Sequence, residues 1–157
     1  MSEDDYPERL EDERLLEGLR LLLARDYFEA HEALEEPWQE LERGGAYKRV
    51  LQALIQLCVS LEHLRRDNAL GAFNVWQKAK QNLKGAPPIV AGVQVLGWSE
   101  EVARFFSRCE LADRVRQRLE GGVAAGDEHL DADQFQPLPP LEEWPVPVLE
   151  EELSARL

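Results

Sequence analysis

Positive charge is scarce in this sequence: 18 lysines and arginines stand against 31 aspartates and glutamates, giving a formal net charge of -13. Such a surface repels phosphate backbones, so the composition argues against a protein that binds nucleic acid through a basic patch. We therefore expect no nucleic-acid partner. The excess of acid fits a solvated face, a solubility adaptation or a docking surface for a basic partner, and charge alone does not choose among these.

Cysteine and long apolar runs are also scarce. Cys58 and Cys109 fall at apolar positions of helical patterns, so we expect two buried small hydrophobes and no disulfide. No apolar run reaches the length of a transmembrane span, and the N-terminus is acidic where a secretory signal would be basic and then apolar. These features predict a cytoplasmic protein with no membrane partner.

The sequence also lacks the common catalytic motifs. It contains no GxSxG motif, P-loop or dinucleotide-binding glycine pattern. The stretch from His31 to Glu35 reads HExxE and has no second histidine of a zinc-protease HExxH motif. Phe28 and Ser60 stand three residues before His31 and His63, where the Glu-x-x-His pairs of di-iron bundles need glutamate.

What is present predicts one all-α domain. The chain has 157 residues, and 44% of them are hydrophobic, which is enough to bury one core. We expect an acidic arm over residues 1–7, a helical domain over 8–120, and an acidic, proline-rich C-terminal extension over 121–157. The domain is predicted to be a single bundle of about five helices with an extended apolar strap and a proline-rich tail.

The apolar periodicity predicts where these helices lie. They are expected from about Pro7 to Arg25, from Tyr27 to Gly44, from Tyr47 to Arg66, from Asn68 to Gly85, and from Ser99 to about Leu119. The third carries apolar residues around most of its circumference and should be central. Residues 86–98 are expected to form the strap. Leu138, Leu141 and Trp144 should hold the tail against its own domain or a neighbouring subunit, and Leu149–Leu157 could form two helical turns.

Polar side chains form a stripe along the second predicted helix. His31, Glu35 and Trp38 recur at i, i+4 and i+7, which places them on one face of the helix. Asp26 and Glu29 have the spacing of an acidic capping box at its start. The third predicted helix carries a second polar line at Gln52, Gln56 and His63 among apolar residues, and buried polar groups need partners.

These two blocks resemble a known family. The run from Tyr27 to Glu32, followed by Glu35 and Trp38, is similar to the HxxxExx(W/Y) signature of the family called domain of unknown function 309. The block from Leu51 through His63 to Asn68, Gly71 and Ala72 resembles that family's following helix and turn. The resemblance extends from about Leu15 to Leu83 and weakly to Leu119. It implies an all-α domain whose signature residues have been suspected of binding a metal, without an established reaction.

Two interpretations of the stripe remain open. In the first, His31, Glu35 and His63 bind a divalent ion such as zinc, nickel, iron or manganese, with Glu32 or Gln56 assisting and Trp38 as a lid. The reaction to expect is then hydrolysis, with Glu32 or Glu35 accepting a proton from water. In the second, Glu35 accepts a hydrogen bond from His31 in a structural core capped by Trp38. The protein would then be an interaction module whose tail binds a partner or a second subunit in a homo-oligomer.

Overall fold

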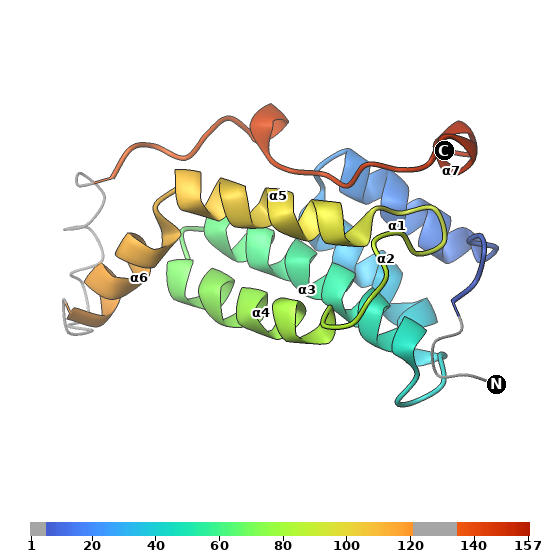
Figure 1. Cartoon of the computed structure of the whole chain (residues 1–157). Helices are drawn as coiled ribbons and strands as arrows, with labels where there is room; N and C mark the ends of the chain where they lie inside the picture. The colour runs from blue at the N-terminus through green and yellow to red at the C-terminus, as the bar shows by residue number, and fades with distance from the viewer. Residues whose placement is uncertain (1–5, 121–134) are drawn as a thin grey trace.

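The computed structural model describes residues 6–120 and 135–157, and the regular secondary structure within these ranges is helical (Figure 1). Seven α-helices follow one another: α1 (Glu13–Leu23), α2 (Tyr27–Gln39), α3 (Ala46–Arg65), α4 (Ala69–Asn82), α5 (Val95–Arg108), α6 (Leu111–Glu120) and α7 (Glu151–Ala155). A short 3-10 helix, η2, spans Leu141–Glu143. The described ranges contain isolated β-bridges and no strand. The all-α prediction is confirmed, and α1 to α5 make up the predicted bundle.

The first two helices form a close antiparallel pair. Asp12 caps α1 by accepting a hydrogen bond from the Arg14 backbone N–H, and this helix starts later than the predicted Pro7. Arg14 also pairs with Glu36 and Glu40, which joins the start of α1 to the end of α2. Asp26 makes no side-chain capping bond, so the predicted capping box is wrong. α2 ends at Gln39, just after Pro37, because the helix loosens there into two i to i+3 hydrogen bonds.

The long helix α3 is the centre of the fold, as predicted. It contacts α2, α4 and α5. Ser60 is buried and donates to the Ala72 carbonyl oxygen at 2.5 Å, which is possible because α3 and α4 approach closely there. The predicted cap at Asn68 is confirmed, since its side chain accepts a hydrogen bond from the Gly71 N–H. Cys58 and Cys109 are buried and unbridged, as expected.

The second half of the bundle differs from the sequence prediction. The predicted strap is correct only for residues 86–94, because α5 begins at Val95 and includes Trp98. The long helix expected from Ser99 to Leu119 is two helices. Glu110 takes a left-handed backbone conformation, with φ of +58°, and the chain turns there before α6 starts. Figure 1 shows α6 leaving the end of the bundle at an angle to α5.

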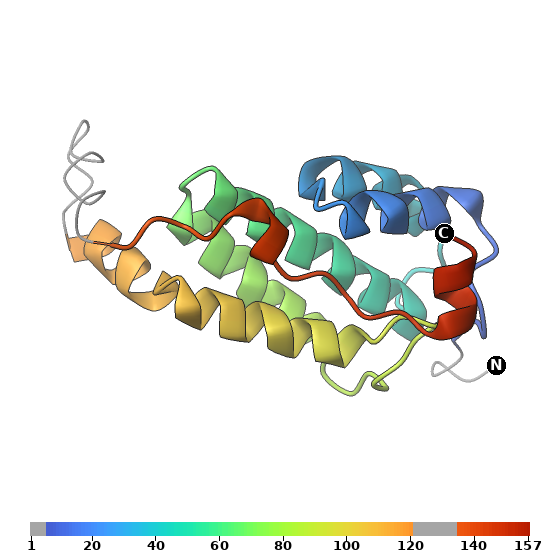
Figure 2. The ribbon, with the colours of Figure 1, turned by 90° about the horizontal axis from the view of Figure 1, so that it is seen from above.

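The C-terminal tail, residues 135–157, packs on its own domain. Figure 2 shows it running from the α6 end to the α1 end, along the line between α5 and the α1–α2 pair. Trp144 is buried, and α7 lies in the stretch where two helical turns were predicted. The prediction that Leu138, Leu141 and Trp144 hold the tail against protein is confirmed for Trp144 and for Leu138, which packs against the core, and is wrong for Leu141, which is exposed. Most of the predicted acidic arm and the start of the extension lie outside the described residues.

No helix among the described residues has the length and apolar character needed to cross a membrane.

Candidate functional site

His31 lies half-buried on α2, and its ring is fixed by its own helix. The Nδ1 atom is 2.5 Å from the Phe28 carbonyl oxygen, one turn earlier. Because a carbonyl oxygen can only accept, Nδ1 carries the hydrogen, and in the neutral imidazole Nε2 then keeps a lone pair. The imidazole also packs against the Phe28 ring, with centroids 5.0 Å apart and the planes at 67°.

Glu32 and Glu35 are exposed on the same helix. Neither makes a hydrogen bond or ion pair with any described residue, so the hydrogen bond predicted between His31 and Glu35 is not formed. The interpretation of these two residues as a buried hydrogen-bonded core is therefore wrong, because the His31 donor is used by the helix backbone and Glu35 faces solvent.

His63 is held in the opposite tautomer. The Asn68 oxygen accepts from the Gly71 N–H at 3.0 Å, which turns the Asn68 amide nitrogen toward His63. This nitrogen lies 3.1 Å from His63 Nδ1 and donates to it, so the Nδ1 lone pair is occupied and neutral His63 carries its hydrogen on Nε2. His63 thus supports the cap of α4.

The remaining predicted site residues have separate partners. Trp38 donates from Nε1 to the Lys48 carbonyl oxygen at 3.1 Å, and the Lys48 ammonium lies 4.7 Å from the ring centroid. Gln56 accepts from Asn82 on α4 at 2.8 Å, and Gln52 is half-buried on α3. No hydrogen bond among these described residues links them to His31. Within residues 6–120 and 135–157, no three His, Cys, Asp or Glu side chains form a group suited to holding a metal ion.

His31 belongs to a cluster that the sequence patterns did not predict. We call it the α2–α3 corner: Phe28, His31, Glu62, Arg65 and Arg66, where α2 begins and α3 ends. The Arg66 guanidinium lies 5.1 Å from the centroid of the Phe28 ring, and Phe28 is 38% exposed. The E-x-x-R-R spacing at the end of the third predicted helix was the available signal, because it places both arginines one turn after the carboxylate.

Glu62 anchors this corner. Its side chain is only 7% exposed and accepts from Arg65 at 2.9 Å through both oxygens and from Arg66 at 2.6 Å. Burial acts to raise the pKa of Glu62, but the hydrogen bonds from the two guanidinium groups outweigh it, and the net pKa is lowered from 4.5. The carboxylate therefore holds both arginines in place.

We predict that Glu62 makes stability depend on pH in the acid range. Because its folded pKa lies below the unfolded value, its contribution is fully present above about pH 4.5 and is lost as pH falls through the folded pKa. Glu62→Gln should lower the free energy of unfolding at pH 7 by about 1 kcal/mol, since both guanidiniums are partly exposed and solvent screens them.

Urea unfolding at pH 7 and pH 3 checks this, with Glu35→Gln as the exposed control. The wild type should lose the Glu62 contribution on acidification, and the gap between wild type and Glu62→Gln should narrow. A gap of equal size at both pH values would contradict the assignment.

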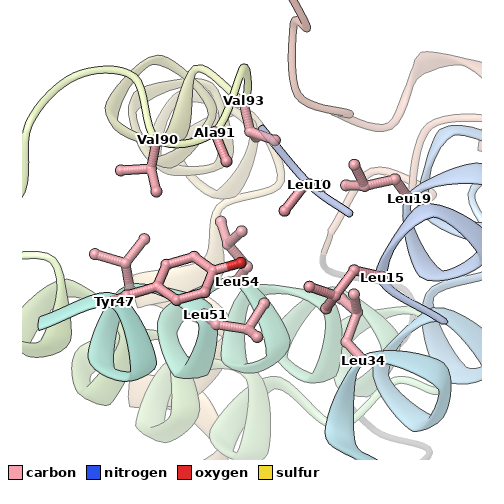
Figure 3. A pocket seen from close by; sticks show the side chains of 11 residues that line it. Leu10, Leu15, Leu19, Leu34, Tyr47, Leu51, Leu54, Val90, Ala91 and Val93 are labelled. Carbon is pink, nitrogen blue, oxygen red and sulfur yellow. The ribbon is translucent and has the colours of Figure 1, made fainter. Parts of the chain in front are cut away.

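A small cavity lies beside the α1–α2–α3 junction and is apolar (Figure 3). Its volume is about 20 Å³, room for roughly one water molecule. Figure 3 shows the Tyr47 hydroxyl pointing into it between leucine and valine side chains. Burial raises the pKa of Tyr47 to about 12, so this phenol is a neutral group in an apolar wall. The cavity is too small for a substrate, and it is lined by core residues.

A larger surface hollow of about 270 Å³ lies between residues 8–9, residues 89–92 and α7. Its rim carries both signs of charge, with Arg9 paired to Glu152 at 3.3 Å. Arg156 crosses it to donate to the Leu10 carbonyl oxygen at 2.7 Å. The hollow is therefore a seam where the tail meets the N-terminal segment.

Together these features define a small helical domain in which His31, one residue of the polar sequence motif, lies at the α2–α3 corner. Residues 15–75 match the model of the family described as "Domain of unknown function (DUF309)", which confirms the resemblance for this part of the chain. The chain is also 52% identical over 48 residues to the Uncharacterized protein YpuF of Bacillus subtilis (strain 168). That alignment covers 31% of this chain and 27% of the relative, so the chain spans about a quarter of the relative's length. Neither description names a reaction.

Proposed function

We propose that the protein is an interaction module that binds an acidic segment of another protein at the α2–α3 corner. The observation that carries this proposal is Phe28, a large apolar side chain that stays exposed between the Arg66 guanidinium and the His31 ring. Exposed aromatic and arginine side chains are the residues most enriched where binding energy is concentrated in protein interfaces.

The choice of an acidic segment rests on the free donors of Arg66. Only its Nε donates to a described acceptor, namely Glu62, so both terminal nitrogens remain available. The Arg66 guanidinium lies over the Phe28 ring, 5.1 Å from its centroid, and its terminal nitrogens form a fork that matches a carboxylate. Phe28 would supply apolar contact beside it.

Photo-crosslinking tests this function. We expect p-benzoylphenylalanine at Phe28 to capture a protein partner in the source cells, and the same probe at Leu119, which is 58% exposed on α6, to capture none of it. The adduct should disappear when Arg66→Glu is added, because a carboxylate of the partner would then face a negative charge at position 66. Equal capture from positions 28 and 119, or capture that Arg66→Glu does not change, would contradict the proposal that the α2–α3 corner binds the partner.

A second candidate function is binding of a divalent ion at His31 and Glu35, and the free Nε2 lone pair of His31 supports it. The Nδ1–H donation to a backbone carbonyl is the arrangement that commonly orients a metal-binding imidazole. Glu35 stands one turn further along the same helix, and Glu32 is exposed nearby. His63 does not fit the set as it stands, because Asn68 occupies its lone pair.

In this second candidate function, His31 and Glu35 would hold the ion, and Glu32 or Glu35 would accept a proton from water during hydrolysis. A bound zinc, nickel, iron or manganese ion would supply Lewis acidity.

Titration with zinc, nickel and manganese should then show that one ion binds per chain. This binding should weaken in acid, because protons compete for the imidazole, and it should be lost in His31→Ala and kept in His63→Ala. Absence of saturable binding to every metal would remove this candidate.

A further inference from the structure

The tail docks on its domain in the way that a bound peptide docks. We call the surface beneath it the tail-binding surface: Arg25 just before α2, Tyr27 at the start of α2, Phe105 on α5, Arg114 on α6, and residues 92–94. Trp144 is the anchor, with 2% of its surface exposed. Its ring centroid lies 4.7 Å from that of Phe105 and 6.2 Å from that of Tyr27.

Around this anchor, the domain recognises the tail mainly through its backbone. Arg25 Nε donates to the Trp144 carbonyl oxygen at 2.8 Å, and the Tyr27 hydroxyl donates to that of Pro145 at 2.8 Å. The Arg114 guanidinium donates to the Gln136 carbonyl oxygen at 2.7 Å. Backbone bonds that satisfy an extended chain, with one side chain in a pocket, are the pattern of peptide recognition.

Further along, the tail pairs with the loop before α5. Gln94 N–H donates to the Val148 carbonyl oxygen at 3.0 Å, and Glu150 N–H donates to that of Gly92 at 2.7 Å, around a Val93–Leu149 bridge. Two ion pairs lie at the margin, Arg108 with Glu143 at 2.5 Å and Arg9 with Glu152 at 3.3 Å. Prolines on either side of Trp144 restrict the free tail, so less conformational entropy is lost on docking.

We propose that the tail-binding surface also takes the tail of a second copy of this chain, giving a reciprocal dimer in which each tail lies on the other molecule. Every contact described above forms identically in trans, so the dimer requires no additional chemistry. Tail and domain are joined through residues 121–134, and a chain of that length spans at most roughly 45–50 Å. This surface shares no residue with the α2–α3 corner, and the proposal does not depend on the proposed function.

Within one molecule, the tail occupies its own tail-binding surface at an effective concentration in the millimolar range. Exchange of tails between two molecules should therefore be seen after unfolding and refolding at high protein concentration. Full-length protein refolded at micromolar concentration is expected to be monomeric by light scattering. Refolded near millimolar concentration, it should contain a dimer that returns slowly to monomer on dilution. Leu141→Ala, on an exposed tail position, should behave as wild type.

A labelled peptide of residues 135–157 separates tail exchange from other association. It should bind the full-length Trp144→Ala chain, whose own tail lacks the anchor, at least tenfold more tightly than the same peptide with Trp144→Ala. If that chain does not fold, wild type refolded in excess peptide should capture the peptide instead.

Three results would overturn the proposal. The first is that neither the Trp144→Ala chain nor the refolded wild type takes up the peptide. The second is that the peptide is taken up but the full-length protein stays monomeric at every concentration. The third is a dimer of equal yield in folded Trp144→Ala, since it would use a different interface.

Discussion

Trp144→Ala is expected to lower the free energy of unfolding by about 3–5 kcal/mol, a loss typical of a core tryptophan. The side chain is buried between Phe105 and Tyr27, although it belongs to a segment with little regular structure. Truncation also removes the indole N–H that donates to the Pro139 carbonyl oxygen at 2.9 Å. The tail would lose both its anchor and the bond that shapes it.

Urea unfolding followed by tryptophan fluorescence and circular dichroism measures this loss. Leu141→Ala is the matched control, three residues earlier on the same tail and 39% exposed, and it should change stability by less than about 0.5 kcal/mol. If the two substitutions cost the same, Trp144 is not the residue that holds the tail.

Gly18→Ala should also be destabilising, by about 1–3 kcal/mol, although alanine is the better helix former. A Cβ at Gly18 would lie 2.5 Å from Cδ2 and 2.7 Å from Cγ of Leu34, so α1 and α2 would have to separate or Leu34 would have to move. Both residues are buried at the centre of the α1–α2 contact.

The sign of this effect should reverse in a Leu34→Ala background. That substitution alone is expected to cost about 2–5 kcal/mol because it leaves a cavity. With the obstructing atoms gone, adding Gly18→Ala should stabilise the protein by up to about 1 kcal/mol, since only the helix propensity difference remains. Chemical denaturation of wild type, the two single variants and the double variant tests this reversal. If the stability losses of the two substitutions add up, a Cβ at position 18 does not collide with Leu34.

Helices were predictable from the sequence where a single apolar period was uninterrupted. The central helix α3 was found almost to the residue because its apolar positions repeat over five turns. The break at Glu110 was missed, because a glutamate in a left-handed conformation leaves no glycine or proline signal. The start of α5 was placed too late, because Gly97 and the valines before it obscured a helical face formed by Val95 and Trp98.

For the candidate site, the sequence pointed to His31 alone among the residues of the α2–α3 corner, and it gave none of the partners of the predicted residues. The stripe of His31, Glu35 and Trp38 does lie along one side of α2. Periodicity gives the face of a helix, yet it does not give the register of α2 against α3, which decides that Phe28 meets Arg66. The partner of His63 was also hidden, because the Asn68 side chain serves the cap of α4 and the imidazole together.

The most direct test of the central claim, that the α2–α3 corner binds a protein, is a double-mutant cycle on the crosslinked partner. The dissociation constant of the complex with this partner would be measured for wild type, Phe28→Ala, Arg66→Ala and the double variant. Glu35→Ala, on the same face of α2, serves as the control. We predict that each single substitution weakens binding at least tenfold, about 1.4 kcal/mol, and that the double variant loses less than the sum because the two side chains act together. Binding within twofold of wild type in both single variants, with folding intact, would contradict the claim.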